Sequence, residues 1–190
     1  MKKGYFTDPR DGKKYKTVKI GEQVWMAENL AFKTLNAKPY LNDKFYAKHY
    51  GLLYNWEEAK LACPSGWHMS TKDEWNELSA YADKCWKRNN PQEKGTYDAA
   101  ALKSKSGWNK DGNGTDELGF SALPGGSGYS GGSFDGVGYY GYWWSASEYN
   151  SNYAYYRDMR YDCEIAYWNL NVKYDLLSVR CVQDSGEAVQ

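Results

Sequence analysis

The sequence predicts a mixed α+β fold. Three observations support this prediction: a β-hairpin pattern near the N-terminus, two amphipathic helical patterns in the first half of the chain, and a return of short strand patterns after residue 141. The chain of 190 residues is long enough to bury one substantial core, and no linker composition interrupts it. We therefore expect residues 1–190 to form a single domain.

The hairpin pattern covers residues 15–27. Alternating segments at 15–20 and 23–27 contain β-branched and aromatic residues, and Gly21-Glu22 between them supplies a turn. This pairing of two short strands around a glycine-containing turn is the local signal on which the prediction of a hairpin depends.

Two helices are predicted next. Residues 52–62 place apolar side chains at helical spacing and stop before Pro64. The second helix begins at Thr71, where Thr71 and Glu74 form a capping box, and residues 88–91 break it. Its buried stripe is predicted to contain Trp75, Leu78, Tyr81 and Ala82. Residues 99–103 allow one further short turn.

Glycine dominates residues 107–141, so this stretch cannot hold a long regular element. The embedded Trp108, Phe120, Leu123 and Phe134 predict a packed loop region rather than a disordered one. Strands are then predicted at 142–147, 153–159, 164–168 and 177–182.

Composition excludes several classes of protein. The formal net charge is zero, which argues against a nucleic-acid binder, and no apolar run approaches the roughly 20 residues that cross a bilayer. Aromatic residues make up 17% of the chain, with 19 Tyr against 5 Phe. Such an excess of tyrosine is typical of a contact surface, because tyrosine joins a large apolar ring to a hydroxyl group.

The four cysteines, at positions 63, 85, 163 and 181, contain no C-x-x-C pair, and with only two histidines they predict no zinc site. They allow three pairings if all are oxidised, and four free thiols if the protein is cytosolic.

Met1-Lys2-Lys3 resembles the start of a secretory signal, but polar residues follow where an apolar segment belongs. We expect either a protein that stays inside the cell or a mature, processed form.

Five motifs in the chain resemble those of one known family, the Fibrobacter succinogenes major paralogous domain. They occur in the order of that family and cover residues 24–181. The motifs are Val24-Trp25-Met26-Ala27-Glu28-Asn29-Leu30, Cys63-Pro64-Ser65-Gly66-Trp67-His68 with Glu74-Trp75, Asn113-Gly114-Thr115-Asp116 with Gly119-Phe120-Ser121-Ala122-Leu123-Pro124-Gly125-Gly126, Trp143-Trp144-Ser145-Ala146-Ser147-Glu148, and Ser178-Val179-Arg180-Cys181.

The resemblance implies a C-type lectin-like fold, in the variant shared with formylglycine-generating enzymes: two helices, a small twisted antiparallel sheet, long glycine-rich loops and adjacent termini. It also implies a Cys63–Cys181 disulfide, which would close a loop of about 118 residues and stabilise the fold by about 4–5 kcal/mol. The pairing of Cys85 and Cys163 stays open. Domains of this kind are mostly exported, so we expect an extracellular or cell-surface location, or alternatively a phage virion.

Residues 149–175 have an unusual composition. Tyr, Asn and Asp account for 14 of these 27 residues, against 31 of the other 163. Tyrosine is a good strand former, but Asn and Asp are not, so an ordinary surface strand does not explain the combination. The codons AAC, TAC and GAC for Asn, Tyr and Asp differ at one base, and diversity-generating retroelements mutate template adenines in lectin-like domains that resemble this one. We therefore expect a retroelement-diversified segment.

The same codon argument divides the segment into varied and constant positions. Substitution at the adenines of AAC does not yield Met159, Glu164, Trp168 or Lys173, which are predicted to be scaffold. It does yield Cys163, which is then a free thiol.

The sequence predicts a ligand-binding surface whose tyrosines give rigid contact area and whose polar residues give adaptable hydrogen bonds. Arg157 and Arg160 are candidates for pairing with ligand carboxylates. The expected partner is macromolecular, a cell-surface protein or glycan; the alternative is an undiversified glycan-binding or structural cell-surface module of the same fold. The candidate ligand-binding residues are Tyr153, Tyr155, Arg157, Asp158, Arg160, Tyr161, Asp162, Ile165, Tyr167, Leu170, Val172, Tyr174 and Asp175.

A structural calcium ion bound by Asp111, Asn113 or Asp116 is a further possibility in the sequence, and an Asx-rich turn is the alternative. An EF-hand is rejected because Phe120 stands where the template needs Glu. The tripeptides Glu-Pro-Asn and Gln-Pro-Asp of calcium-dependent sugar binding are missing.

No catalytic arrangement is predicted. His68, between Trp67 and Met69, is expected to be a hydrogen-bonded core histidine, and the spacings support no nucleophile–histidine pair. An enzyme derived from the formylglycine-generating fold is the competing class, but its active-site motif has no match here. Residues 125–141 lack the Gly-Lys-Ser/Thr of a phosphate loop. We expect a binding protein and no enzyme, with no cofactor.

Overall fold

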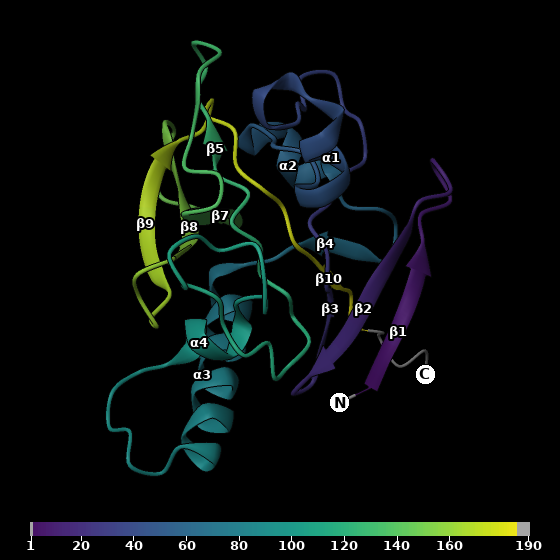
Figure 1. The fold of residues 1–190 in the computed structure, drawn as a ribbon. Helices are drawn as coiled ribbons and strands as arrows, with labels where there is room; N and C mark the ends of the chain where they lie inside the picture. Colours follow the sequence, from purple (N-terminus) through teal and green to yellow (C-terminus); the bar gives the residue numbers. More distant parts are fainter. Residues whose placement is uncertain (1, 186–190) are drawn as a thin grey trace, which may run out of the picture.

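The computed structural model describes residues 2–185 and shows an α+β fold with three antiparallel sheets (Figure 1). The largest sheet has the strand order β1-β2-β3-β10-β4, the smallest pairs β5 with β6, and the third has the order β7-β8-β9. The strands are β1 (Lys2–Thr7), β2 (Lys14–Ile20), β3 (Gln23–Met26), β4 (Trp67–Met69), β5 (Ser127–Gly128), β6 (Phe134–Asp135), β7 (Tyr140–Glu148), β8 (Tyr153–Arg160), β9 (Tyr167–Val172) and β10 (Cys181–Gln183).

The five-stranded sheet confirms the N-terminal hairpin, since β2 and β3 pair through the Gly21-Glu22 turn. It also contains β1, which the sequence analysis missed because five of its six residues are exposed and no apolar alternation marks it. The predicted strand at 177–182 is wrong in extent. Only its end forms β10, while Leu177 and Ser178 make isolated bridges to Tyr54 and Trp143.

The two predicted helices correspond to α2 (Trp56–Ala62) and α3 (Lys72–Asn89). Asn55 caps α2, so Leu52 and Leu53 lie before the helix rather than in it. The Thr71–Glu74 capping box is confirmed at the start of α3. Tyr81 was wrongly placed in the buried stripe: its side chain lies at the edge of the helix face and is 39% exposed.

Two shorter α-helices, α1 (Lys44–Tyr50) and α4 (Asp98–Leu102), and the 3-10 turn η1 (Tyr40–Asn42) complete the secondary structure. No apolar periodicity in the sequence predicts α1, because none of its residues is fully buried. In contrast, α4 is buried throughout and forms the short turn expected at 99–103. No helix within residues 2–185 has the length and apolar character needed to cross a membrane.

The glycine-rich stretch packs against the core, as predicted: Trp108 and Phe120 are buried. Gly126 shows why glycine is needed there. Its φ is +66°, and a Cβ atom would lie 2.5 Å from the backbone oxygen of Asp135. The chain can therefore pass close to β6 only with glycine at this position.

Tryptophans fill the interior. Trp25, Trp75 and Trp143 pack around Phe120 in one cluster, with centroids of neighbouring rings 5.0–6.0 Å apart. A second cluster contains Trp56, Trp67 and Trp144. All six of these tryptophans are at least 93% buried, so they form the scaffold of the fold.

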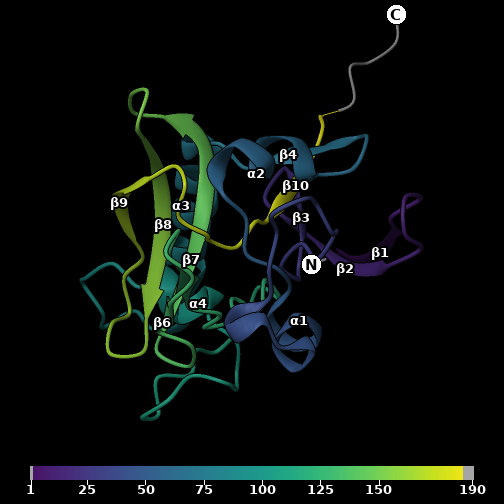
Figure 2. The ribbon, with the colours of Figure 1, turned by 90° about the horizontal axis from the view of Figure 1, so that it is seen from above.

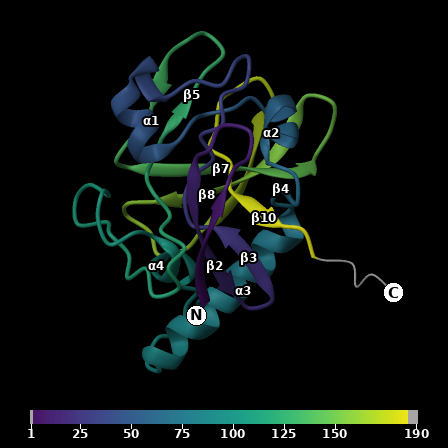
Figure 3. The ribbon, with the colours of Figure 1, turned by 90° about the vertical axis from the view of Figure 1, so that its right-hand side faces the viewer.

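The three-stranded sheet lies beside this core, with β8 in the middle and β9 at the free edge (Figure 2). Helix α3 lies against one face of this sheet, since Trp168 of β9 and Arg157 of β8 both bond to side chains of α3. In the view of Figure 3 the five-stranded sheet lies in front of β7 and β8, and the last described strand, β10, belongs to the five-stranded sheet.

Candidate ligand-binding surface

The unusual segment 149–175 forms β8, β9 and the loops beside them. Successive strand residues point to opposite faces, so its tyrosines are divided between two surfaces. One face, which we call the α3 face, carries Tyr155 and Arg157 and is turned toward helix α3. The opposite face, which we call the tyrosine face, carries Tyr140, Tyr142 and Tyr156.

On the α3 face, Tyr155 contacts Trp168 edge-on, with the ring centroids 6.2 Å apart. The Lys72 ammonium lies 3.9 Å from the Tyr155 ring centroid, and Trp168 donates a 2.8 Å hydrogen bond to Asn76 Oδ1. Tyr153 and Leu170 occupy the same face beyond these contacts and are each 40% exposed. On this face, Tyr153 and Leu170 are therefore exposed, while Tyr155 and Trp168 are held by contacts with helix α3.

Arg157 does not belong to the binding surface, contrary to the sequence-based expectation. It is buried, and its guanidinium donates to Asp98 Oδ2 at 2.7 Å and to Ser79 Oγ at 2.6 Å. Asp158 is also buried, and accepts hydrogen bonds from Arg160 Nε at 3.0 Å and Asn169 Nδ2 at 2.6 Å. The sequence could not show this burial, because polar residues in a strand usually mark its solvent side.

Asp175 is 7% exposed and accepts a hydrogen bond from the backbone N–H of Ser130, so it holds a loop in place. Tyr174 beside it is 61% exposed. Lys173, predicted as scaffold, is buried, pairs with Glu148 and lies over the Trp56 ring.

The other positions predicted as scaffold differ among themselves. Met159 is fully buried, and Trp168 is held by Asn76. The side chain of Glu164 is about half exposed, but its carbonyl oxygen accepts the N–H of Ala99 at the start of α4. The side chains of Met159, Trp168 and Lys173 are therefore packed or bonded within the protein, as expected for scaffold positions, whereas that of Glu164 is half exposed.

The far end of the sheet holds the remaining candidates. Arg160 is exposed and lies over the Tyr167 ring, with 5.2 Å from its guanidinium carbon to the centroid. Tyr161 contacts Tyr139 and Tyr140 edge-on. Asp162 is exposed, whereas Ile165 and Val172 are half-buried.

The tyrosine face contains a hollow of about 160 Å³ that the sequence analysis did not predict. The structure brings together residues from four strands and two loops to line it, and three of the strand residues lie side by side on β7, β8 and β9. The lining residues are Ser127, Tyr129, Tyr142, Tyr156, Asn171 and Leu177. The alternation of Tyr140, Tyr142 and Trp144 is the sequence pattern from which the position of Tyr142, on the β7 side of the hollow, could be predicted.

Burial perturbs the phenols of this hollow. It raises the pKa of Tyr156 to about 12 and also raises that of Tyr142, with nearby tyrosines and Asp158 adding to the effect. Both hydroxyl groups are therefore protonated at any physiological pH and can donate hydrogen bonds. Among residues 2–185, no charged side chain lines the hollow.

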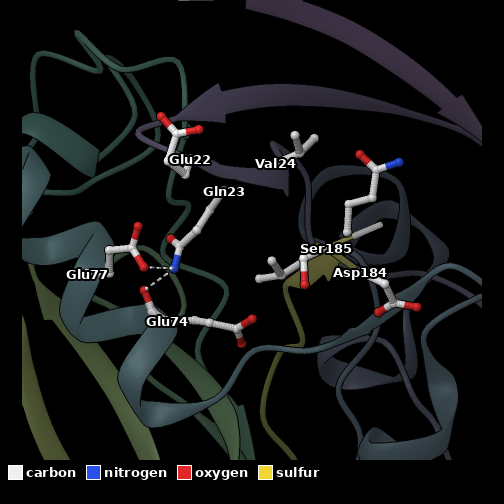
Figure 4. A pocket seen from close by; sticks show the side chains of 9 residues that line it. Glu22, Gln23, Val24, Glu74, Glu77, Asp184 and Ser185 are labelled. Atoms are coloured by element: carbon white, nitrogen blue, oxygen red, sulfur yellow. Dashed lines mark hydrogen bonds between the residues drawn. The ribbon is translucent and has the colours of Figure 1, made fainter. Parts of the chain in front are cut away.

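A second, larger cavity of about 440 Å³ lies between β3, α3 and the end of β10 (Figure 4). Glu22, Glu74, Glu77 and Asp184 line it, and Gln23 donates to Glu77 and to the backbone of Glu74. His68 lies beside it and bonds to Glu74 Oε1 at 2.7 Å and Asp184 Oδ1 at 2.6 Å. These hydrogen bonds, chiefly that to Glu74, raise the pKa of His68 to about 9.

His68 is hydrogen-bonded as predicted, but it is not a core residue, because 37% of its side chain is exposed. His68 belongs to β4. Its two carboxylate partners come from other elements: Glu74 from the start of α3 and Asp184 from the residue after β10. It therefore acts as a link between these elements.

The residues considered for calcium hold their own loop. The side chain of Asn113 accepts a hydrogen bond from the N–H of Trp108 at 3.0 Å. The carboxylate of Asp116 accepts two hydrogen bonds from Ser121, one from its N–H and one from its hydroxyl, both at 2.7 Å. Asp111 has a φ of +59°. Residues 2–185 contain no group of three or more acidic, histidine or cysteine side chains arranged to hold a metal ion.

The cysteines resolve the open pairings. Cys63, directly after α2, and Cys181, at the start of β10, form a disulfide with a Cα–Cα distance of 6.0 Å. Cys85 and Cys163 are both free. The Cys163 sulfur lies 3.2 Å from the Tyr167 hydroxyl.

The fold and its surface define a disulfide-linked α+β domain with a tyrosine-rich antiparallel sheet. The sequence profile of the Fibrobacter succinogenes major domain matches residues 18–183, so the chain belongs to this bacterial family. No curated protein and no solved structure matches the chain.

Proposed function

We propose that this protein binds a macromolecular ligand, a cell-surface protein or glycan, through the β7–β9 sheet. The observation that carries the proposal is the exposure of large side chains on this sheet, on its loops and on the neighbouring β5–β6 turn: Tyr129, Tyr149, Tyr153, Tyr167, Leu170 and Tyr174 are each 38–61% exposed. Aromatic side chains that are exposed together provide contact area at low cost in conformational entropy. The proposed role is binding, without catalysis.

We further propose a C-type lectin-like fold for the domain. Helices α2 and α3, the small antiparallel sheets, the packed glycine-rich loops and the presence of β1 and β10 in one sheet support it. The Cys63–Cys181 disulfide supports an extracellular or cell-surface location, because disulfides persist in oxidising compartments.

Diversification of residues 149–175 by a retroelement is the third part of the proposal. The enrichment in Tyr, Asn and Asp supports it, as do the side-chain contacts of Met159, Trp168 and Lys173, which are not reachable from AAC. Burial removes Arg157 and Asp158 from the positions that can vary freely. The genomic test is a neighbouring reverse transcriptase with a near-copy of this segment that differs at adenines; absence of both leaves an undiversified binding module.

The binding test compares the two faces of the sheet on an array of surface proteins and glycans. One variant carries Tyr153→Ala and Leu170→Ala on the α3 face. Another carries Tyr167→Ala on the tyrosine face and Tyr129→Ala in the β5–β6 turn beside it. A matched control carries Tyr5→Ala and Phe45→Ala, whose side chains are 65% and 59% exposed elsewhere.

We expect at least one face variant to lose about tenfold or more in affinity, because aromatic anchors dominate binding energies. The control should bind like the unchanged protein. Unchanged binding by both face variants, or an equal loss in the control, would remove this sheet as the binding surface.

A further inference from the structure

The hollow on the tyrosine face has unused hydrogen-bonding groups. Several tyrosines within residues 2–185 use their hydroxyls in hydrogen bonds, namely Tyr15, Tyr40, Tyr54, Tyr97 and Tyr167. The hydroxyls of Tyr129, Tyr142 and Tyr156 make none in that part of the chain, and the same holds for the Ser127 hydroxyl. Four hydroxyl groups therefore line one small space without protein partners.

The Asn171 side chain adds further capacity. Its Oδ1 accepts the N–H of Val172 at 2.9 Å, while its Nδ2 has no partner among the described residues. Hydroxyl and amide groups without protein partners bind water in the free protein, and a ligand that supplies hydrogen bonds of its own can replace that water. The hollow thus favours a ligand with several hydroxyl groups.

Charge and shape restrict the ligand further. Asp158, a carboxylate on this face, accepts hydrogen bonds from Arg160 and Asn169 and does not line the hollow. The walls are tyrosine rings: Tyr142 and Tyr156 meet edge-on with centroids 5.7 Å apart, and Tyr140 stacks on Tyr142 at 5.8 Å. Leu177 adds an apolar surface. Aromatic walls with neutral donors suit an uncharged ring that has one apolar face.

Size points to a single ring. A volume of about 160 Å³ is below the roughly 300–1,000 Å³ of sites that enclose drug-sized ligands.

We infer that this hollow binds one neutral sugar residue, held by the hydroxyls of Tyr129, Tyr142, Tyr156 and Ser127 and the amide of Asn171. This inference rests on the proposed function, since it names a glycan residue as the part of the ligand that this sheet recognises. Four of the six lining residues lie outside 149–175, so the hollow combines a constant wall with Tyr156 and Asn171 from the variable segment.

The test is titration of the ¹⁵N-labelled protein with neutral methyl glycosides, followed by NMR, with methyl glucuronide as a charged comparison. We expect saturable shifts confined to the lining residues at concentrations on the order of millimolar to tens of millimolar. Tyr142→Phe and Tyr156→Phe each remove one hydroxyl and keep the ring, and should weaken binding about twofold to tenfold. Tyr174→Phe, an exposed tyrosine outside the hollow, is the matched control.

Three outcomes would overturn the inference: no saturable shift with any neutral glycoside, equal affinity in the two Phe variants and the unchanged protein, or stronger binding of the glucuronide. The array with the face variants separates this failure from that of the proposed function. If those variants lose macromolecular binding while no glycoside binds, the sheet is a binding surface that recognises something other than a neutral sugar.

Discussion

Arg180 Nε lies 2.7 Å from Asn29 Oδ1, although 151 positions separate the two residues. The Asn29 oxygen also accepts the indole N–H of Trp143, and its amide donates to Tyr50 O and Ser178 Oγ. The remaining guanidinium nitrogens of Arg180 donate to the backbone oxygens of Met26, Phe120 and Ser121. This buried network connects four of the five family motifs.

Asn29→Ala is expected to destabilise the protein by more than about 3 kcal/mol. The substitution leaves Arg180 Nε, Trp143 Nε1 and Tyr50 O without this partner, and each buried polar group left unpaired costs about 1–3 kcal/mol. Urea unfolding measures the change in the free energy of unfolding. Arg88→Met, at an exposed position on α3, is the control and should change it by less than about 0.5 kcal/mol; a similar small change for Asn29→Ala would contradict the network.

Arg157→Met should destabilise the fold by about 3–5 kcal/mol, because it leaves the buried Asp98 carboxylate without its charged partner. Arg88→Met, at an exposed position on α3 and with no buried carboxylate partner among the described residues, is the control and should cost less than about 0.5 kcal/mol. Thermal and urea unfolding compare the two variants. Equal stability would mean that the Arg157–Asp98 pair does not support the sheet.

Removing the disulfide with Cys63→Ser and Cys181→Ser should lower stability by about 4–5 kcal/mol, because the loop it closes spans 118 residues. Cys163→Ser removes a free thiol and serves as the control. Alkylation of the denatured, unreduced protein should label two cysteines by mass spectrometry. Labelling of none or four would contradict the assignment of one disulfide and two thiols.

Stability should depend on pH through His68. Its pKa in the folded protein is raised to about 9 from the ordinary value of 6.5, so the charged ring is favoured in the folded state. The stabilisation is complete below about pH 6.5 and is lost as the pH rises through about 9. Because the side chain is more than one third exposed, solvent screening limits the effect to about 1 kcal/mol.

The pH dependence is measured as the difference in unfolding free energy between the unchanged protein and His68→Gln, from pH 6 to pH 10. This difference should shrink with rising pH. His49→Gln is the control, since its ring bonds to the backbone oxygen of Phe45 rather than to a carboxylate. A difference that stays constant or grows across this interval would exclude the His68 link.

Local patterns predicted much of the fold. The Gly21-Glu22 hairpin and the Thr71–Glu74 capping box depend on neighbouring residues, and the structure has both. The sequence contains no clear signal for helix α1, because the residues that face the core, such as Tyr46 and Ala47, are only partly buried. The extent of β10 depends on pairing with β3 and β4, which lie far away in the sequence.

The candidate site was predicted at the level of the segment but not of the side chain. Residue types placed the surface at 149–175, yet the register between β7, β8 and β9 decides which face each residue occupies. Arg157 is therefore in the interior, while Tyr142, from outside the segment, joins Tyr156 in the hollow. Strand register and burial depend on distant contacts that composition does not contain.

The position of β10 between β3 and β4 has a consequence for the order of folding. Strands β3 and β4 do not pair with each other; each of them pairs with residues 181–183. The same segment carries Cys181 and follows Arg180. Contacts that span more than a hundred residues carry a high loop-closure entropy and slow the folding reaction. A nascent chain emerging from the ribosome or from a translocation pore can form the hairpin and α3 early, but its central sheet and its disulfide must wait until almost the whole described chain is free.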